Sequence, residues 1–173
     1  MTDQVVLVNE EDEAIGLMPK LEAHQKGLLH RAFSVFIFNS KGEMLLQRRA
    51  FGKYHSEGLW SNTCCSHPLP DEPTYEGAAR RLREEMGIET ELHFVYAFQY
   101  HAAFDNGLTE HEYDHVFWGY SDDIPQINPE EVSEYKYLSL ENIEADLKQN
   151  PAHYTEWFKI CFKEAIEKIP MEL

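Results

Sequence analysis

The sequence predicts an α/β fold of the α+β kind, in which a mixed β-sheet is flanked by helices. Residues 32–38, Ala-Phe-Ser-Val-Phe-Ile-Phe, are almost continuously apolar and rich in β-forming residues, as expected for a central strand buried on both faces. Apolar residues then recur with helical spacing between Pro73 and Gly87, which predicts a helix that packs on the sheet. A last amphipathic helix is predicted from about Tyr154 to Ile169.

Length, composition and charge narrow the class of protein. A chain of 173 residues that is 43% apolar has the size and composition of one folded domain. We therefore expect a single domain over residues 1–173, with an N-terminal hairpin and C-terminal helices as extensions. The formal charge of −16 argues against nucleic acid or an anionic membrane as a partner. Three cysteines, two of them adjacent, do not form a disulfide framework, so the expected location is the cytoplasm.

The other elements are bounded by turn residues. Val5 to Val8 and Ile15 to Leu17 predict a hairpin, and a short helix is expected from Lys20 to Lys26, ended by Gly27. Glu43 to Arg49 is expected to pair with the central strand in a hairpin that supports the sheet. Further strands are expected at His93 to Tyr100, Thr109 to Trp118 and Glu130 to Leu138. A helix capped by Ser139 is expected from Leu140 to Gln149.

Two thiols and an imidazole lie close together in the segment from Ser61 to Pro68. Side chains alternate in an extended segment, so Cys65 and His67 point to one face, and Cys64 and Ser66 point to the other. One thiol and one imidazole therefore share a site. Taken alone, a Cys-x-His pattern is more often a small buried residue and an ordinary loop histidine than a functional site.

Basic residues precede this segment. Arg49 ends a predicted strand, and Lys53 follows in a loop whose flexibility comes from Gly52 and Gly58. A guanidinium fork and a mobile ammonium suit a diphosphate ligand, although a solvated strand end would have the same composition.

The helix after Pro73 combines an apolar stripe with charged residues. The stripe consists of Tyr75, Ala78, Ala79, Leu82 and Met86, and Asp71 or Thr74 can cap the first turn. Arg81 and Glu85 are four residues apart, outside the stripe, and can face a common site.

Several of these motifs together resemble type I isopentenyl-diphosphate isomerases, a family within the Nudix fold superfamily. They are the Asn-x-x-Cys-x-His-Pro pattern at residues 62–68, Glu72, and the run from Arg80 to Ile88. The resemblance extends from about Val5 to about Trp157. It implies a Nudix-type α/β/α sandwich with a mixed β-sheet and flanking helices.

Two positions depart from the Nudix signature. Ser66 occupies the position of its first glycine, and Arg81 occupies the position of a glutamate that would be a Mg²⁺ ligand in a Nudix hydrolase. An arginine there removes a metal ligand and adds a phosphate-binding group. We therefore expect the helix to bind a diphosphate without hydrolysing it.

The resemblance also implies roles for individual residues. Cys65 and Glu112 would transfer protons, with Tyr100 as a relay, and Trp157 would lie beside the hydrocarbon part of the substrate. Two metal sites and a diphosphate anchor are implied. The site for Mn²⁺ or Zn²⁺ would consist of His24, His30, His67, Glu110 and Glu112. At the other site, Mg²⁺ would bridge Glu85 and the diphosphate. The diphosphate anchor would consist of Lys20, Arg49, Lys53 and Arg81. His111 and His115 alternate out of register with the two glutamates and are expected not to be ligands.

The implied reaction is the interconversion of isopentenyl and dimethylallyl diphosphate through a tertiary carbocation, an early step of isoprenoid biosynthesis. The partner would be this small molecule, without nucleic acid or membrane, and the protein would be a monomer or homodimer. Two alternatives remain open: a Nudix hydrolase acting on a nucleoside or isoprenoid diphosphate, and a non-catalytic module that binds a metal or ligand. Cys65 together with Glu112 favours the isomerase, because hydrolysis does not require a thiol.

Overall fold

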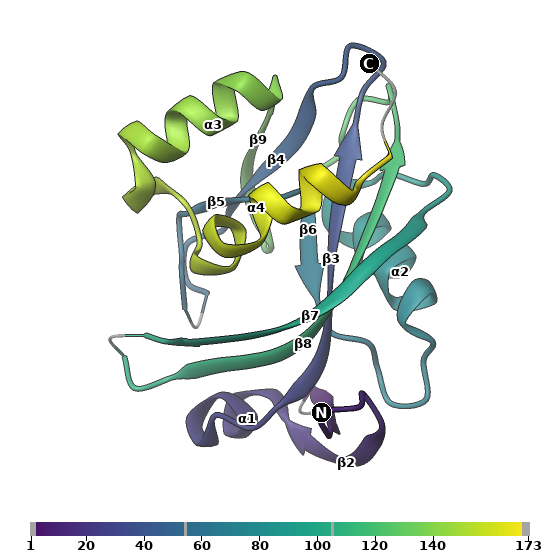
Figure 1. The fold of residues 1–173 in the computed structure, drawn as a ribbon, viewed down its shortest axis with the longest axis vertical. Helices are drawn as coiled ribbons and strands as arrows, with labels where there is room; N and C mark the ends of the chain where they lie inside the picture. Colours follow the sequence, from purple (N-terminus) through teal and green to yellow (C-terminus); the bar gives the residue numbers. More distant parts are fainter. Residues whose placement is uncertain (1–2, 54, 105, 171–173) are drawn as a thin grey trace.

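A computed structural model describes residues 3–53, 55–104 and 106–170, and these form one nine-stranded mixed sheet with helices around it (Figure 1). Strand β3 (His30–Phe38) lies at its centre. It pairs in parallel with β8 (Thr109–Tyr120) along its whole length and in antiparallel with the short β6 (Cys64–Ser66) on the other side. The strand that carries Cys64 and Cys65 and the strand that carries Glu110 and Glu112 are therefore both neighbours of the central strand.

The N-terminal hairpin is confirmed. Strand β1 (Gln4–Val8) pairs in antiparallel with β2 (Ala14–Pro19) and joins the sheet at the start of β3. Helix α1 (Lys20–Lys26) follows at once and ends at Gly27, whose φ of 65° is the left-handed conformation expected of a glycine at a helix end. This hairpin and α1 lie together at the lower end of the molecule in Figure 1.

The expected supporting hairpin of β3 and β4 (Met44–Arg49) is wrong beyond its turn. The two strands share only the pair Phe38 and Met44, and β4 pairs instead with β9 (Val132–Leu138) and β5 (Trp60–Ser61). The strands separate because the chain around Thr63 inserts between them. The Thr63 hydroxyl donates to the Leu45 carbonyl at 2.7 Å and accepts from the Ile37 amide at 2.9 Å, which satisfies both buried backbone groups.

Strand β7 (His93–Ala103) forms a long antiparallel ribbon with β8 that continues beyond the rest of the sheet (Figure 1). It is three residues longer than expected. Tyr100 of β7 lies directly opposite Glu112 of β8 in the register of this ribbon.

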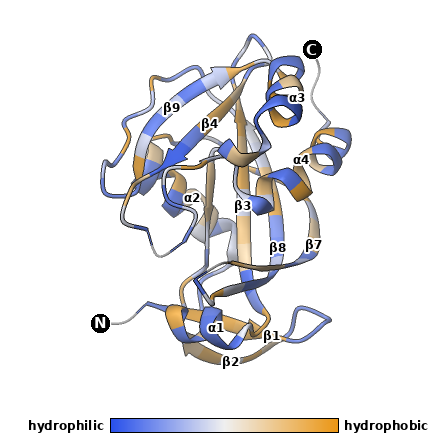
Figure 2. Ribbon diagram, turned by 90° about the vertical axis from the view of Figure 1, so that its left-hand side faces the viewer, coloured by the Kyte–Doolittle hydropathy of each residue, from blue (hydrophilic) through white to orange (hydrophobic). Residues whose placement is uncertain are grey.

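Helices cover both faces of the sheet, as Figure 2 shows for α2 and α4 on opposite sides of β3. On one face, α2 (Thr74–Met86) packs on Phe33, Val35 and Ile37. On the other face, α4 (Glu156–Lys168) packs on Phe36 and Phe38. The alternating side chains of β3 thus contribute to two apolar cores, which confirms that this strand is buried on both faces and that the fold is a three-layer α/β/α sandwich.

The remaining helical segments agree closely with expectation. Helix α3 (Leu140–Gln149) has the expected bounds, and the Ser139 hydroxyl accepts from the Asn142 amide at 3.1 Å. A 3₁₀ turn, η1 (Pro151–His153), leads into α4, which begins two residues later than expected because Thr155 is its cap. None of the described helices is long and apolar enough to cross a membrane.

Helix α2 differs from expectation at its first turn. Neither Asp71 nor Thr74 caps it; its cap position is Pro73, and Asp71 adopts a left-handed φ of 65° in the preceding turn. Tyr75 is 45% exposed and lies outside the buried stripe, where Gly77 takes its place. The helix approaches the sheet so closely at Gly77 that a Cβ atom would lie 3.2 Å from the Phe33 ring.

Candidate active site

Three imidazoles and one carboxylate converge at one end of the central strand. His24 comes from α1, His30 begins β3, His67 follows β6, and Glu112 lies on β8. The Nε2 atoms of His30 and His67 are 3.2 Å apart, and Oε2 of Glu112 lies 3.4 Å from the first and 3.0 Å from the second. One donor atom from each of the four residues lies within 4.8 Å of all the others.

Hydrogen bonds to the backbone fix the tautomers of two of these rings. Nδ1 of His24 lies 2.7 Å from the Lys20 carbonyl, and Nδ1 of His30 lies 2.9 Å from the Leu28 carbonyl. A carbonyl oxygen can only accept, so both Nδ1 atoms carry hydrogen and both Nε2 lone pairs point into the cluster. Histidines that bind a metal ion through one ring nitrogen commonly donate from the other to a carbonyl in this way, and the site is suited to a divalent metal ion.

The charges in the cluster favour an ionised carboxylate at Glu112. Burial opposes ionisation of Glu112, but its interactions with His30 and His67 outweigh the burial and hold the carboxyl pKa well below its ordinary range. Burial lowers the pKa of His67 to about 4. Burial also acts to lower the pKa of His30, but the interactions with Glu112 prevail and raise it.

Glu110 lies two residues before Glu112, on the same face of β8. Its Oε2 atom is 3.9 Å from Nε2 of His24 and 3.1 Å from Nε2 of His55. His24, His55 and Glu110 form a second group of possible metal donors that shares His24 with the first. The five residues that the resemblance implies as metal ligands therefore lie in two adjacent groups that share His24, with His55 as an additional neighbour. His111 and His115 point to the other face and contact Gly27 and Asp12.

Cys65 is held in one orientation by Asn62. Nδ2 of Asn62 donates to the carbonyls of Val35 at 3.0 Å and of Cys64 at 3.1 Å, so its Oδ1 atom faces the Cys65 sulfur, at 3.0 Å. An amide oxygen can only accept, so the thiol is the donor in this contact. Burial raises the pKa of the Cys65 thiol well above its ordinary value, which also favours the neutral form.

Cys64 points the other way, as expected from the alternation along an extended strand. It packs in the core beneath α2, with its sulfur 3.6 Å from Oε2 of Glu85. Behind Cys65, the Ser34 hydroxyl lies 3.5 Å from the sulfur and 2.8 Å from Oδ2 of Asp114. Asp114 is 2% exposed, and burial raises its pKa well above its ordinary value.

The basic residues gather beside the thiol. Lys20, Arg49, Lys53 and Arg81 line one cavity together with Cys65 and His67. Two carboxylates neutralise part of this charge: Arg81 lies 2.9 Å from Glu85 and 3.0 Å from Glu131, and Lys53 also pairs with Glu131.

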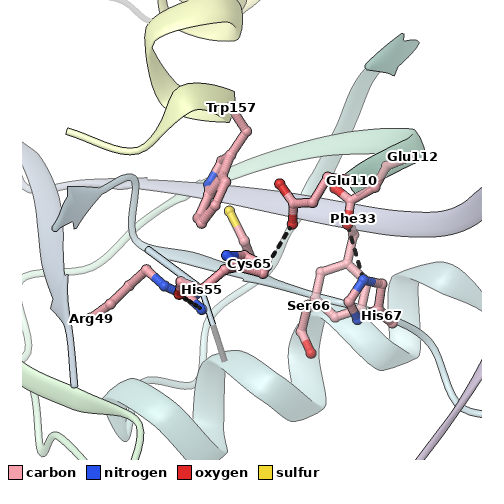
Figure 3. Close-up of a pocket in the computed structure, with 9 residues that line it drawn as sticks. All are labelled: Phe33, Arg49, His55, Cys65, Ser66, His67, Glu110, Glu112 and Trp157. Carbon is pink, nitrogen blue, oxygen red and sulfur yellow. Dashed lines mark hydrogen bonds and ion pairs between the residues drawn. The ribbon is translucent and has the colours of Figure 1, made fainter. Parts of the chain in front are cut away.

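A second cavity adjoins the first, and the two share Arg49, Cys65, Ser66 and His67 (Figure 3). Trp157 points from α4 towards Cys65, while Glu110 and Glu112 enter from β8. The Arg49 guanidinium lies 5.1 Å from the Trp157 ring. Tyr100 is buried nearby; burial and then Glu110 raise the pKa of its hydroxyl.

Comparison with known proteins agrees with this geometry. The NUDIX domain model matches residues 28–158. A Pectobacterium atrosepticum protein named isopentenyl-diphosphate Delta-isomerase is 54% identical, and the alignment covers 92% of this chain and 89% of that protein. The isopentenyl-diphosphate Delta-isomerase 2 of Aromatoleum aromaticum is 49% identical, with 96% and 88% covered. The chain belongs to the isopentenyl-diphosphate Delta-isomerase family.

Solved structures place this family member within the wider fold. A crystal structure of a Deinococcus radiodurans protein aligns with a TM-score of 0.76 at 22% identity and covers 93% of this chain and 98% of that chain. A MutT protein from Methanosarcina mazei aligns with a TM-score of 0.68 at 26% identity, over 83% of this chain and 96% of that chain. The fold is thus shared with proteins whose sequences differ widely from this isomerase-family chain.

Three residues of the site were not identified from the sequence of this family member. His55 is an isolated loop histidine, Glu131 is one acid in an acidic turn, and Asp114 continues the alternation of Glu110 and Glu112 along β8. Only Asp114 could have been found, because its register places it on the same face as the two glutamates.

Proposed function

We propose that the protein interconverts isopentenyl diphosphate and dimethylallyl diphosphate, as the names of its close relatives suggest. The observation that carries this proposal is the position of Cys65 and Glu112. They come from strands on either side of β3 and line one cavity, beside the cluster of basic residues that would bind a diphosphate.

The reaction moves a carbon–carbon double bond, so one proton is added at a carbon and another is removed near it. Cys65 and Glu112 are the proposed proton-transfer groups. A thiol that keeps its hydrogen beside an ionised carboxylate makes a complete acid–base pair, and the two groups exchange roles when the reaction reverses. Tyr100, opposite Glu112 on β7, is the proposed relay on the carboxylate side.

The tertiary carbocation between the two proton transfers needs a dry wall rich in π electrons. Trp157 and Phe33 line the cavity that contains Cys65, and Trp157 is 3% exposed. An aromatic face stabilises a nearby cation, and exclusion of water protects it from capture. These two side chains are the proposed surroundings of the hydrocarbon part of the substrate.

The donor set suits two kinds of metal ion. The nitrogen and oxygen donors of His24, His30, His67, Glu110 and Glu112 suit Mn²⁺ or Zn²⁺. The carboxylate of Glu85 would hold Mg²⁺ together with the diphosphate, which Lys20, Arg49, Lys53 and Arg81 would bind. When bound, the ions would supply positive charge that holds the carboxylates and the diphosphate in place.

We further propose that residues 1–173 act as one catalytic domain in the cytoplasm, as a monomer or homodimer. The described cysteines Cys64, Cys65 and Cys161 are all free thiols, which supports a reducing compartment.

A product assay tests the proposal. The protein is incubated with isopentenyl diphosphate, Mg²⁺ and Mn²⁺, and the products are followed by ¹H and ³¹P NMR. We expect dimethylallyl diphosphate with its diphosphate intact. Release of phosphate would favour the hydrolase, and binding without turnover would favour the non-catalytic module.

A further inference from the structure

His55 lies at the edge of the histidine cluster and belongs to no motif that the family resemblance explains. It is 5% exposed, in the loop between β4 and β5. Its ring stacks on Phe104 at a centroid distance of 4.7 Å and meets the edge of Trp157 at 5.8 Å. Arg49 donates to its backbone carbonyl at 3.3 Å. The ring is therefore held in place on several sides.

The two nitrogens of this ring have different neighbours. Nε2 lies 3.1 Å from Oε2 of Glu110, and Nδ1 lies 3.1 Å from the hydroxyl of Ser56. The Nδ1 atoms of His24 and His30 face carbonyl oxygens, so each of these rings, when neutral, carries its hydrogen on Nδ1 and has a lone pair on Nε2. A hydroxyl can donate as well as accept, so His55 is free to carry its hydrogen on Nε2, towards the carboxylate.

We propose that His55 is a positioning residue of the metal centre, which donates from Nε2 to Glu110 and orients this carboxylate towards the three imidazoles. Glu110 is 4% exposed, and its Oε2 atom is nearer to His55 than to His24. A buried carboxylate needs hydrogen-bond donors, and outer donors of this kind set the orientation of metal ligands. The inference rests on the metal centre proposed above and adds a residue to it.

The test is metal affinity, measured separately from activity. Zn²⁺ affinity is determined by competition with a chromophoric chelator for wild-type protein, His55→Ala and His55→Gln. The glutamine amide keeps a donor near the position of Nε2. We expect the alanine variant to bind Zn²⁺ about 10- to 100-fold more weakly and the glutamine variant to stay within about threefold of wild type. His101→Ala, which removes an exposed histidine of β7, is the matched control and should change nothing.

Two further measurements separate positioning from direct ligation and from misfolding. The Co²⁺ absorption bands of His55→Gln should match those of wild type, because the ligand set is unchanged. In a Glu110→Gln background, the removal of His55 should cost no additional affinity, because its effect passes through Glu110. Circular dichroism melting of each apoprotein identifies any variant that loses affinity by unfolding.

Unchanged Zn²⁺ affinity in a folded His55→Ala protein would overturn the proposal. Equal loss in the glutamine and alanine variants, with shifted Co²⁺ bands, would overturn it in favour of direct ligation. If wild-type protein bound neither Zn²⁺ nor Co²⁺, the proposed metal centre and the role of His55 in it would both be overturned. The product assay with isopentenyl diphosphate would then test the proposed isomerase activity separately.

Discussion

The amide oxygen of Asn62 lies 3.0 Å from the sulfur of Cys65 and is fixed there, because the amide nitrogen of Asn62 is occupied by two backbone carbonyls. The thiol of Cys65 therefore donates its hydrogen to the amide oxygen of Asn62. This single side chain connects the backbone of β3 and β6 to the Cys65 sulfur.

Substitution of Asn62 should remove the hydrogen bond that orients the Cys65 thiol. We expect Asn62→Ala to lower the isomerisation rate about 10- to 100-fold, because Cys65 loses its fixed orientation. The carbonyls of Val35 and Cys64 also lose a donor, which should lower the free energy of unfolding by about 1–3 kcal/mol. Steady-state kinetics and urea unfolding measure the two effects. Wild-type kinetics in the variant would show that Asn62 does not position the thiol.

The charge of Glu112 should control the protonation of His30. In the apoprotein, burial acts to lower the His30 pKa, and Glu112 raises it above its ordinary value. Removal of this charge in Glu112→Gln leaves burial in place, so the His30 pKa should fall. The ring proton signals of His30 and His67 in an NMR titration report the change, and in wild type His67 should stay neutral down to about pH 4. A His30 pKa that is equal in the two proteins would contradict the account.

The same pKa values predict how metal binding depends on pH. A proton on His30 competes with the metal ion, and because its pKa is raised, this competition begins above the ordinary histidine value of about 6.5. Zn²⁺ affinity should therefore weaken as the pH falls from 8 to 6. Chelator competition at several pH values measures the change. The dependence should be shallower in a variant with a lower His30 pKa.

Glu131 lies where an anionic ligand would meet Lys53 and Arg81. The substrate diphosphate must compete with this carboxylate, so Glu131→Gln should lower the KM for isopentenyl diphosphate about 3- to 10-fold, on the order of 1 kcal/mol. Glu134→Gln is the matched control, since Glu134 lies three residues later, on β9, and pairs with Arg48 outside the site. A KM that rises in the Glu131 variant would indicate that Glu131 helps to bind the substrate.

The close contact between α2 and the sheet predicts a stability difference between two glycines. A Cβ atom at Gly77 would lie 2.8 Å from Oε1 of Glu72, 3.2 Å from the Phe33 ring and 3.3 Å from Cα of Pro68, whereas one at Gly16 would have its nearest neighbour at 3.9 Å. Gly77→Ala should lower the free energy of unfolding by about 1–2 kcal/mol, after a gain in helix propensity is subtracted. Gly16→Ala should be nearly neutral. Thermal melting of both variants gives the comparison.

Much of this fold follows from local pattern. The run of residues 32–38 predicted a strand buried on both faces, and the Ser139 cap predicted the start of α3, because both signals act over a few neighbouring residues. The separation of β3 and β4 could not be predicted, since it depends on the chain around Thr63 inserting between them. Tyr75 has the correct helical spacing but is exposed, because the close approach of the helix at Gly77 shifts the buried face.

The candidate site shows the same division. Alternation within each motif places Cys65 with His67, and Glu110 with Glu112, and the family resemblance implied that the two pairs share a site. His55 and Glu131 come from loops without periodic structure, and their positions depend on contacts with residues far away in the sequence. Lone residues of this kind carry no local signal.

The central claim is that Cys65 and Glu112 move protons to and from carbon. The most direct test is to incubate the protein with isopentenyl diphosphate and Mg²⁺ in deuterium oxide, alongside Cys65→Ser, Glu112→Gln and Cys64→Ser. We expect wild type and Cys64→Ser to form dimethylallyl diphosphate with deuterium in its carbon skeleton. The isomerisation rates of Cys65→Ser and Glu112→Gln should be lower by several orders of magnitude. Stoichiometric release of phosphate or pyrophosphate with undeuterated carbon would contradict the central claim.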